Sequence, residues 1–390
     1  MEASFSLSAT SSLIFGPTEL FNLPRLVSSR GFAHLALVVS PSFQRSSAAA
    51  TLLAKLQSQG IATTLFPVTG EPTVEQIDAL SAAVASCKAD AVVGIGGGSV
   101  LDTAKAVSVM AWQLTLHGEI SVLRYLEGVG DLPPPSQRLP LIAIPTTAGT
   151  GSEATKNAVI ARFGPRGFKK SLRHDAYIPD LVIIDPTLHL GLPRTVAAAS
   201  GMDALTQLLE SYLSRTANPF TDALALDALG RVGNALPLVL STRSDEVRLW
   251  GEMAYCAYIS GVIMGSAGLG YVHSIAGPMG ALHPVPHGVA CGHLLAPITN
   301  AIVLAMREDP QNHVVRFEKL NRLSQLWKVE GPRGVLEFLE GLESLAQLPS
   351  LNTYGFCQDE IPGLVESAAQ RGSPVVLSFT VLSTILRKVF

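Results

Sequence analysis

Short apolar runs alternate with amphipathic stretches through the first half of the chain. Runs rich in Val and Ile predict strands over residues 34–40, 63–69, 90–98, 140–147 and 180–186. Between them, residues 46–59, 74–87 and 102–113 have the spacing of helices. Buried strands that alternate with helices form a parallel sheet covered on both faces. The pattern therefore predicts an α/β domain with a doubly wound, Rossmann-like parallel sheet.

After residue 186 the strand pattern stops and helical periodicity takes over. Helices are predicted over residues 193–214, 221–240, 246–265, 316–329, 334–348 and 375–389. We therefore expect an all-helical second domain and divide the chain into residues 1–190 and 191–390. The uncharged run 253–272 is long enough to span a membrane, but its four glycines favour a buried helix that breaks into a turn. No membrane association is expected.

Composition narrows the class of protein. The chain has 390 residues, 47% of them hydrophobic and 15% charged, which is typical of a folded protein of two domains. Its net charge is −3 and it has no Lys/Arg block, so no nucleic-acid partner is expected. The cysteines Cys87, Cys256, Cys291 and Cys357 are far apart and read as reduced thiols. With no basic region before the first apolar run, we expect a cytoplasmic protein.

Two glycine-rich loops each follow a predicted strand. "GIGGGSVLDTAKAV" (94–107) runs from a strand into a helix, and its consecutive glycines let a phosphate approach the helix N-terminus. Its spacing is not that of the Gly-x-Gly-x-x-Gly fingerprint, and an ordinary turn is the alternative. "PTTAGTGSEAT" (145–155) is the second loop. Because such loops form the ligand crevice of an open parallel sheet, the pair favours a dinucleotide.

Four side chains of the second half form a candidate metal site. Asp203 and Gln207 are four residues apart and share one face of a predicted helix. His273 and His287 lie in Gly/Pro-rich stretches further along the chain. A carboxylate and two imidazoles suit a catalytic Zn²⁺ or Fe²⁺ with an open position for substrate. On these residues alone, buried structural histidines and a surface carboxylate are the alternative.

The motifs together resemble a known family. "GGGSVLDTAKAV", "PTTAGTGSEAT", "SGMDALTQLLESY" and "GLGYVHSIAGPMGALHPVPHGVA" have the order and spacing of the iron-containing (group III) alcohol dehydrogenases. The resemblance covers nearly the whole chain. It implies the fold shared with dehydroquinate synthases, a metal between the two domains, and a homodimer. It also implies NAD(P)-dependent, metal-assisted hydride transfer between an alcohol and an aldehyde or ketone.

The resemblance assigns site residues by position. Cofactor contacts, to the pyrophosphate or along the cofactor cleft, fall on Gly97, Gly98, Ser99, Asp102, Thr146, Thr147, Thr155, Lys169 and Leu188. Ligands of Fe²⁺ or Zn²⁺ fall on Asp203, Gln207, His273 and His287.

Three positions depart from the family pattern. Gln207 stands where many members have a third histidine, and an amide oxygen is a weaker ligand than imidazole, although three ligands suffice for zinc. Gly277 stands where many have a histidine implicated in proton transfer, which makes His283 a candidate catalytic residue. Ser40 stands where NAD-preferring members often have Asp. Without that carboxylate NADP is permitted, and Arg45 is available to its 2′-phosphate.

Three other functions stay open at this point. One is a metal-independent reductase resembling the maleylacetate reductases. Another is an NAD-dependent lyase of the dehydroquinate synthase type, and the third is a cofactor-binding relative without catalysis. The persistence of Asp203, His273 and His287 favours the metal-assisted dehydrogenase.

Overall fold

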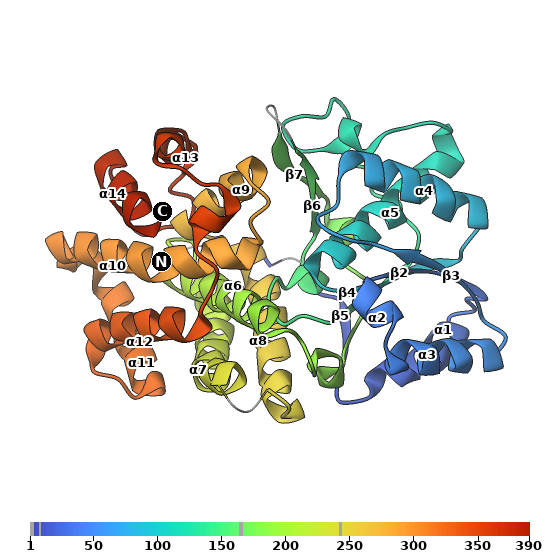
Figure 1. The fold of residues 1–390 in the computed structure, drawn as a ribbon, viewed down its shortest axis with the longest axis horizontal. Coiled ribbons are helices and arrows are strands. Elements are labelled where there is room, and N and C mark those ends of the chain that lie inside the picture. Colours follow the sequence, from blue (N-terminus) through green and yellow to red (C-terminus); the bar gives the residue numbers. More distant parts are fainter. Residues whose placement is uncertain (1–3, 8, 164–166, 242–243) are drawn as a thin grey trace. The chain divides into compact units, whose positions relative to one another are not determined.

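The computed structural model describes residues 4–7, 9–163, 167–241 and 244–390. The chain divides into two compact units (Figure 1). The first, called the sheet unit here, comprises Ser8–Thr147 and Gly151–Leu190. The second, the helical unit, comprises Met1–Leu7, Ala148–Thr150 and Gly191–Phe390.

A parallel sheet is the framework of the sheet unit. Within the described residues its six strands are β1 (Ser12–Phe15), β2 (His34–Val39), β3 (Ala62–Pro67), β4 (Ala91–Gly96), β5 (Leu141–Pro145) and β8 (Leu181–Ile184). Their order across the sheet is β1-β8-β5-β4-β2-β3, and every neighbouring pair is parallel. The parallel sheet predicted from the alternating pattern is confirmed. Strand β1 was not predicted, because it is short and mostly exposed and so lacks the apolar run of a buried strand.

Helices cover both faces of this sheet. On one face lie α1 (Leu23–Ser28) and α3 (Ser47–Ser58), which bury Val27 and Leu52 against Leu37 of β2. On the other lie α4 (Val74–Cys87) and α5 (Gly98–His117), which pack on Val38. Successive residues of a strand point to opposite faces, so both Leu37 and Val38 are buried. This explains the continuous apolar runs in the sequence.

The strand order reverses direction between β2 and β4. From β2 the chain passes to the edge strand β3, then returns to β4 on the other side of β2 and continues to β5. In open parallel sheets the ligand crevice lies at the carboxyl ends of the strands flanking such a reversal. Ser40 follows β2 and Gly97 follows β4, and the Ser40 N–H donates to the Ile95 carbonyl at 3.1 Å.

A separate hairpin was not predicted. Strands β6 (Asn157–Arg162) and β7 (Phe168–Arg173) pair antiparallel outside the main sheet. Residues 158–161 of β6 form a short apolar run, but β7 carries Lys169, Lys170 and Arg173, so the pair lacks the longer Val/Ile runs of the parallel strands. The remaining short elements of the sheet unit are α2 (Pro41–Gln44), η1 (Glu19–Asn22), η2 (Val122–Tyr125), η3 (Ser152–Ala154), η4 (Asp175–Tyr177) and η5 (Pro186–His189).

The helical unit contains no strand among its described residues, as the sequence predicts. Its α-helices are α6 (Arg194–Leu213), α7 (Pro219–Ser241), α8 (Val247–Ala267), α9 (Tyr271–Leu282), α10 (His287–Glu308), α11 (Val314–Trp327), α12 (Gly331–Ala346), α13 (Ile361–Ser367) and α14 (Phe379–Val389). Short 3₁₀ turns are η6 (Pro310–His313), η7 (Leu351–Tyr354) and η8 (Gln358–Glu360). The Gly/Pro-rich stretches around His273 and His287 prove to be the N-terminal turns of α9 and α10.

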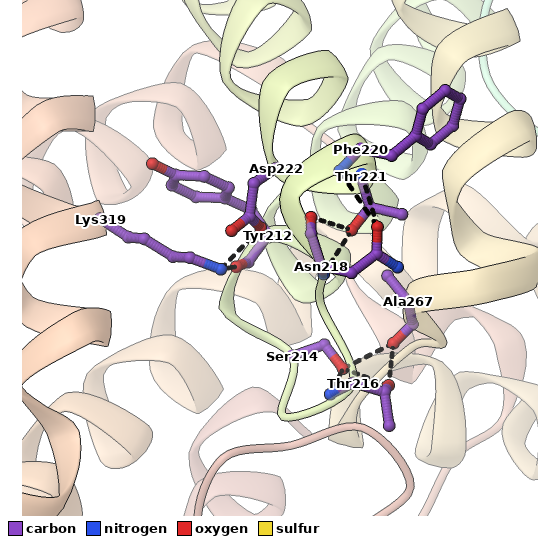
Figure 2. Close-up of polar contacts among 9 residues, drawn as sticks. All are labelled: Tyr212, Ser214, Thr216, Asn218, Phe220, Thr221, Asp222, Ala267 and Lys319. Carbon is purple, nitrogen blue, oxygen red and sulfur yellow. Dashed lines mark hydrogen bonds and ion pairs between the residues drawn. The ribbon is translucent and has the colours of Figure 1, made fainter. Parts of the chain in front are cut away.

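The carboxyl end of α6 is tied to two other helices (Figure 2). Lys319 of α11 donates to the Tyr212 carbonyl at 2.8 Å, which satisfies one of the orphan carbonyls of that helix end. Ser214 and Thr216 donate to the carbonyl of Ala267, the last residue of α8, at 2.6 and 2.5 Å. These contacts fix the corner between α8 and α9 against α6.

Some helices have the composition of membrane spans. Among the described residues α7 and α10 are long and apolar enough, and α8 with α9 would form a third if the pair, bent by 104°, counted as one. In α10, 67% of the most apolar window is buried inside the protein, because the helix packs on α6, α9 and α12. The bend confirms the predicted break of the run 253–272, which falls at Gly268.

The packing of α10 on α6 depends on Gly288. A Cβ atom at this position would overlap the carbonyl oxygen of Ala199 in α6, and a backbone atom does not yield as a flexible side chain would. Gly288→Ala should therefore lower the free energy of unfolding by about 1–3 kcal/mol, the usual cost of overpacking. Urea unfolding followed by circular dichroism measures the change.

Gly341→Ala in α12 is the matched control. Nothing lies within 4 Å of a Cβ at Gly341, which is exposed, so alanine should be neutral or stabilise the helix by up to about 1 kcal/mol. Equal unfolding free energies for the two variants would show that Gly288 is not needed for the approach of the helices.

Candidate active site

A cluster of metal-ligating side chains lies within the helical unit. Asp203 comes from α6, His273 from α9, and His287 and Cys291 from α10. One ligand atom of each lies within 4.8 Å of those of the other three. The side chains of Asp203 and His273 are 2% and 6% exposed, whereas that of His287 is 34% exposed. The cluster is therefore accessible from the His287 side.

The distances in the cluster suit a shared central ion better than direct hydrogen bonds. His273 Nε2 and His287 Nε2 lie 3.4 and 3.9 Å from Asp203 Oδ1, beyond normal hydrogen-bond lengths. Asp203 Oδ1 is buried and has no hydrogen-bond partner among the described residues. A buried carboxylate oxygen without a partner is costly unless a cation neutralises it. Carboxylate and imidazole are ligands of Zn²⁺ and Fe²⁺, so these residues fit a divalent metal.

Glu210 fixes the orientation of His273. It lies seven residues after Asp203, on the same face of α6. Its Oε2 lies 2.8 Å from His273 Nδ1, and its Oε1 accepts a hydrogen bond from the Val272 N–H at 2.7 Å. A carboxylate that accepts from one ring nitrogen leaves the other free to bind a metal. His273 Nε2 consequently points toward Asp203.

Gln207 lies beside Asp203 with its carbonyl oxygen turned to another residue. Gln207 Oε1 accepts a hydrogen bond from Ser260 Oγ of α8 at 2.5 Å. Burial alone would raise the pKa of Asp203, but the nearby charge of His287, the neighbouring His273 ring and the Gln207 amide outweigh burial and lower that pKa. The Gln207 amide thus stabilises the ionised form of Asp203.

In the sheet unit, two loops meet beside the reversal of strand order. Gly97 is the N-cap of α5, at the carboxyl end of β4, and Thr147 follows the neighbouring strand β5. The two residues are so close that a Cβ at Gly97 would lie 3.2 Å from the Thr147 side chain. The N-terminus of the 20-residue α5 supplies free N–H groups and a partial positive charge. This arrangement can bind the pyrophosphate of a dinucleotide.

Two family models match the chain. Iron-containing alcohol dehydrogenase matches residues 10–186, and the C-terminal domain of the Fe-containing alcohol dehydrogenase family matches residues 197–380. The chain belongs to the iron-containing alcohol dehydrogenase family. It is an oxidoreductase of the alcohol dehydrogenase and aldehyde reductase type, which confirms the function predicted from the motifs.

Individual relatives support the assignment. The chain is 36% identical to the probable alcohol dehydrogenase EutG of Escherichia coli over 308 residues, 79% of this chain and 74% of that protein. It is 31% identical to the lactaldehyde reductase of E. coli over 371 residues, 91% and 90% of the two chains. The crystal structure of a 1,3-propanediol oxidoreductase superimposes with a TM-score of 0.86 at 26% identity, covering 100% of both chains. The two-part fold of this dehydrogenase is thereby confirmed.

Two predicted cofactor contacts belong to a buried network around Lys105. This lysine of α5 is 1% exposed and donates to Ser152 Oγ at 2.8 Å and Thr155 Oγ1 at 2.9 Å. Asp102 accepts from Ser152 Oγ at 2.5 Å and from the Val159 N–H at 2.9 Å. The side chains of Asp102 and Thr155 therefore hold the second loop against α5. A direct contact of either with a dinucleotide stays a prediction.

The other predicted cofactor contacts occupy different surroundings. Gly97, Gly98 and Ser99 begin α5, and Thr146 and Thr147 follow β5. Lys169 of β7 is engaged elsewhere, since its Nζ lies 2.6 Å from the Glu71 carboxylate and its side chain is only 9% exposed. Leu188 packs at the edge of the core on the α3 side of the sheet. The structure thus brings the glycines and threonines together, while Lys169 is paired with an acid.

His283, the predicted proton-transfer residue, is not among the cluster residues. It follows α9, ten residues and thus about 15 Å of helix beyond His273. Its Nε2 lies 2.7 Å from Glu360 Oε1, and its ring contacts Phe356 edge-on at 4.5 Å between centroids. These partners are structural, and a catalytic role of His283 stays a prediction.

One residue of the cluster, Cys291, and one that contacts it, Glu210, were not predicted from the sequence, although each carried a signal. Glu210 is at i+7 from Asp203, so it continues the helix face of Asp203 and Gln207. Cys291 is at i+4 from His287 and shares its helix face. Cys291 forms no Cys-x-x-Cys pair in the sequence, because its neighbours in space are histidines.

Glu153, within the second loop, should make stability depend on pH. It is 2% exposed, and burial raises its pKa from 4.5 to about 7, outweighing the charge of Lys105. Between these values the folded protein keeps a proton that the unfolded chain releases, so the free energy of unfolding falls as pH rises through the window. Glu153→Gln removes this loss and should stabilise the protein by about 1–3 kcal/mol at about pH 8 and little at about pH 5.

Thermal unfolding at both pH values measures the effect. Glu119→Gln, at an exposed glutamate of the same unit, is the control and should leave both midpoints unchanged. An equal shift of the Glu153→Gln midpoint at the two pH values would contradict the buried titration.

Proposed function

We propose that this dehydrogenase interconverts a small aldehyde and its alcohol with NADPH as the preferred hydride carrier and Zn²⁺ or Fe²⁺ bound by Asp203, His273 and His287. The partnerless buried Oδ1 of Asp203, surrounded by two imidazole nitrogens, is the observation that carries the metal. The names of the relatives, lactaldehyde reductase and 1,3-propanediol oxidoreductase, support a small hydroxylated substrate.

Each side chain of the cluster has a distinct task in this reaction. A divalent metal, when bound, supplies Lewis acidity that stabilises negative charge on the substrate oxygen. Asp203 contributes the anionic ligand, and Glu210 keeps the ring of His273 in its binding orientation. The exposed side of His287 leaves the site open to substrate. Hydride transfer further requires that the reacting carbons of substrate and nicotinamide be held about 3–3.5 Å apart.

Gln207 supports the site in this proposal without being a ligand. Its oxygen is engaged by Ser260 and its amide stabilises ionised Asp203. Histidine at this position would supply an imidazole nitrogen, whereas glutamine supplies a hydrogen bond to a ligand. Gln207 therefore acts as a positioning residue for Asp203.

The metal requirement can be tested with Asp203→Asn. The amide keeps the size of the side chain but removes the anionic ligand. We expect metal loss and a fall in kcat/KM of at least about 100-fold, because even outer partners of metal ligands contribute 10- to 100-fold. Metal content is measured by elemental analysis, and activity by NADPH absorbance with a panel of short aldehydes.

Asp359→Asn, at an exposed aspartate of η8, is the matched control and should behave as wild type. If wild-type activity survives EDTA and Asp203→Asn is fully active, the protein is a metal-independent reductase and the proposal is wrong.

Ser40 is the proposed determinant of NADPH preference. Its Oγ accepts from the Phe43 N–H at 3.2 Å and so caps α2, and aspartate is an equally good N-cap residue. In Ser40→Asp the carboxylate would repel a 2′-phosphate and accept from a ribose 2′-hydroxyl. We expect kcat/KM with NADPH to fall roughly 10- to 100-fold, the effect of about 1–3 kcal/mol of repulsion, while NADH activity is kept or rises.

Ser58→Asp, at the far end of α3, controls for the added charge and should leave the ratio of the two cofactors unchanged. A Ser40→Asp enzyme with an unaltered NADPH-to-NADH ratio would remove Ser40 from cofactor selection.

A further inference from the structure

Cys291 faces the metal cluster from α10. It lies one turn after His287 on the same face of the helix and is completely buried. Its Sγ is 3.6 Å from His287 Nε2 and 3.9 Å from His273 Nε2. The thiol therefore lies next to both imidazoles of the cluster.

The other buried cysteine of the helical unit shows what an ordinary structural thiol does here. Cys256 of α8 is also fully buried, and its Sγ donates to the Ala228 carbonyl of α7 at 3.2 Å. That contact satisfies the thiol within the helix packing. Cys291 has imidazole nitrogens as its polar neighbours instead, and the same nitrogens surround the partnerless Oδ1 of Asp203.

Four of the six separations among the ligand atoms are close to those of a tetrahedral metal site. With zinc–ligand distances of about 2.0–2.3 Å, the corners of such a site lie about 3.4–3.6 Å apart. The sulfur–nitrogen distances of Cys291 are 3.6 and 3.9 Å, and the oxygen–nitrogen distances of Asp203 are 3.4 and 3.9 Å. The sulfur, carried by the same helix as His287, thus lies near both imidazoles at about the spacing of a fourth ligand atom.

We propose that Cys291 is the fourth protein ligand of the metal, binding as a thiolate in place of the ligand that Gln207 does not supply. The inference rests on the metal site of the proposed function and deepens it, since it names a ligand and a class of metal. A soft thiolate beside two imidazoles and a carboxylate selects zinc over the harder divalent ions. Thiolate ligands are compatible with alcohol chemistry, because catalytic zinc sites with cysteine ligands carry it out in other dehydrogenases.

Cobalt(II) provides a readout that does not depend on catalysis. Apoprotein is prepared with a chelator and titrated with Co²⁺ and, separately, with Zn²⁺ in competition with a chromophoric chelator. A thiolate bound to Co²⁺ gives an intense charge-transfer band in the near ultraviolet. We expect this band in wild type and in the matched control Cys256→Ala, and its absence in Cys291→Ser and Cys291→Ala. The zinc dissociation constant should rise at least about 10-fold in both Cys291 variants.

The outcomes separate this inference from the proposed function. The thiolate ligand is overturned if wild type lacks the charge-transfer band and Cys291→Ser binds Co²⁺ and Zn²⁺ as wild type does. If Asp203→Asn abolishes the binding of both metals in the same experiment, the metal site itself stands. If neither metal binds wild-type protein and the Asp203→Asn enzyme is fully active, the metal-assisted function itself fails. Circular dichroism of each variant checks that the helical unit is folded. Serine is nearly isosteric with cysteine, so Cys291→Ser keeps the test valid where alanine destabilises the core.

Discussion

A single buried oxygen atom, Oδ1 of Asp203, is the constraint around which the helical unit is arranged. An ionised carboxylate in a protein interior is tolerated only when opposite charge or hydrogen bonds compensate it. The Gln207 amide and the nearby charges of the histidines favour the ionised carboxylate, yet Oδ1, which lies 3.4 and 3.9 Å from the two imidazoles, keeps no hydrogen-bond partner among the described residues. The fold therefore retains a destabilising group at the point where α6, α9 and α10 converge. Such a destabilising group is expected at a functional site. Binding a cation there removes the unfavourable energy of the unpaired carboxylate, and this gain adds to the affinity for the cation.

Three features of the surrounding helices make this convergence possible. Gly288 lets α10 approach the backbone of α6, so that the side chains of its first two turns reach Asp203. Lys319 and the hydroxyls of Ser214 and Thr216 secure the end of α6 and the α8–α9 corner. Glu210 then sets the rotation of His273. Backbone packing thus determines where the ligands lie, and a hydrogen bond determines which ring nitrogen is presented.

The sequence predicted those features that depend on local patterns. Val/Ile runs and helical periodicity sufficed for the parallel sheet and the helical unit, and strand-end glycines located the loop at Gly97. Other features depend on pairing across the chain. The β6–β7 hairpin has only the short apolar run 158–161, and Lys169 was assigned to a cofactor although Glu71, almost one hundred residues earlier, pairs with it. Likewise the residues near Gln207 in the sequence do not reveal that Ser260 donates a hydrogen bond to its side-chain oxygen.

A thiolate ligand at Cys291 would change the charge of the metal site as well as its donor atoms. Asp203 with two neutral histidine ligands would leave a divalent metal with one positive charge in a mostly buried site. A thiolate at Cys291 removes that charge, and a neutral centre costs less to bury than a charged one. The same electron donation weakens the Lewis acidity of the metal and so its stabilisation of an alkoxide. A thiolate at Cys291 beside Asp203 therefore favours firm retention of the metal over maximal polarisation of the substrate.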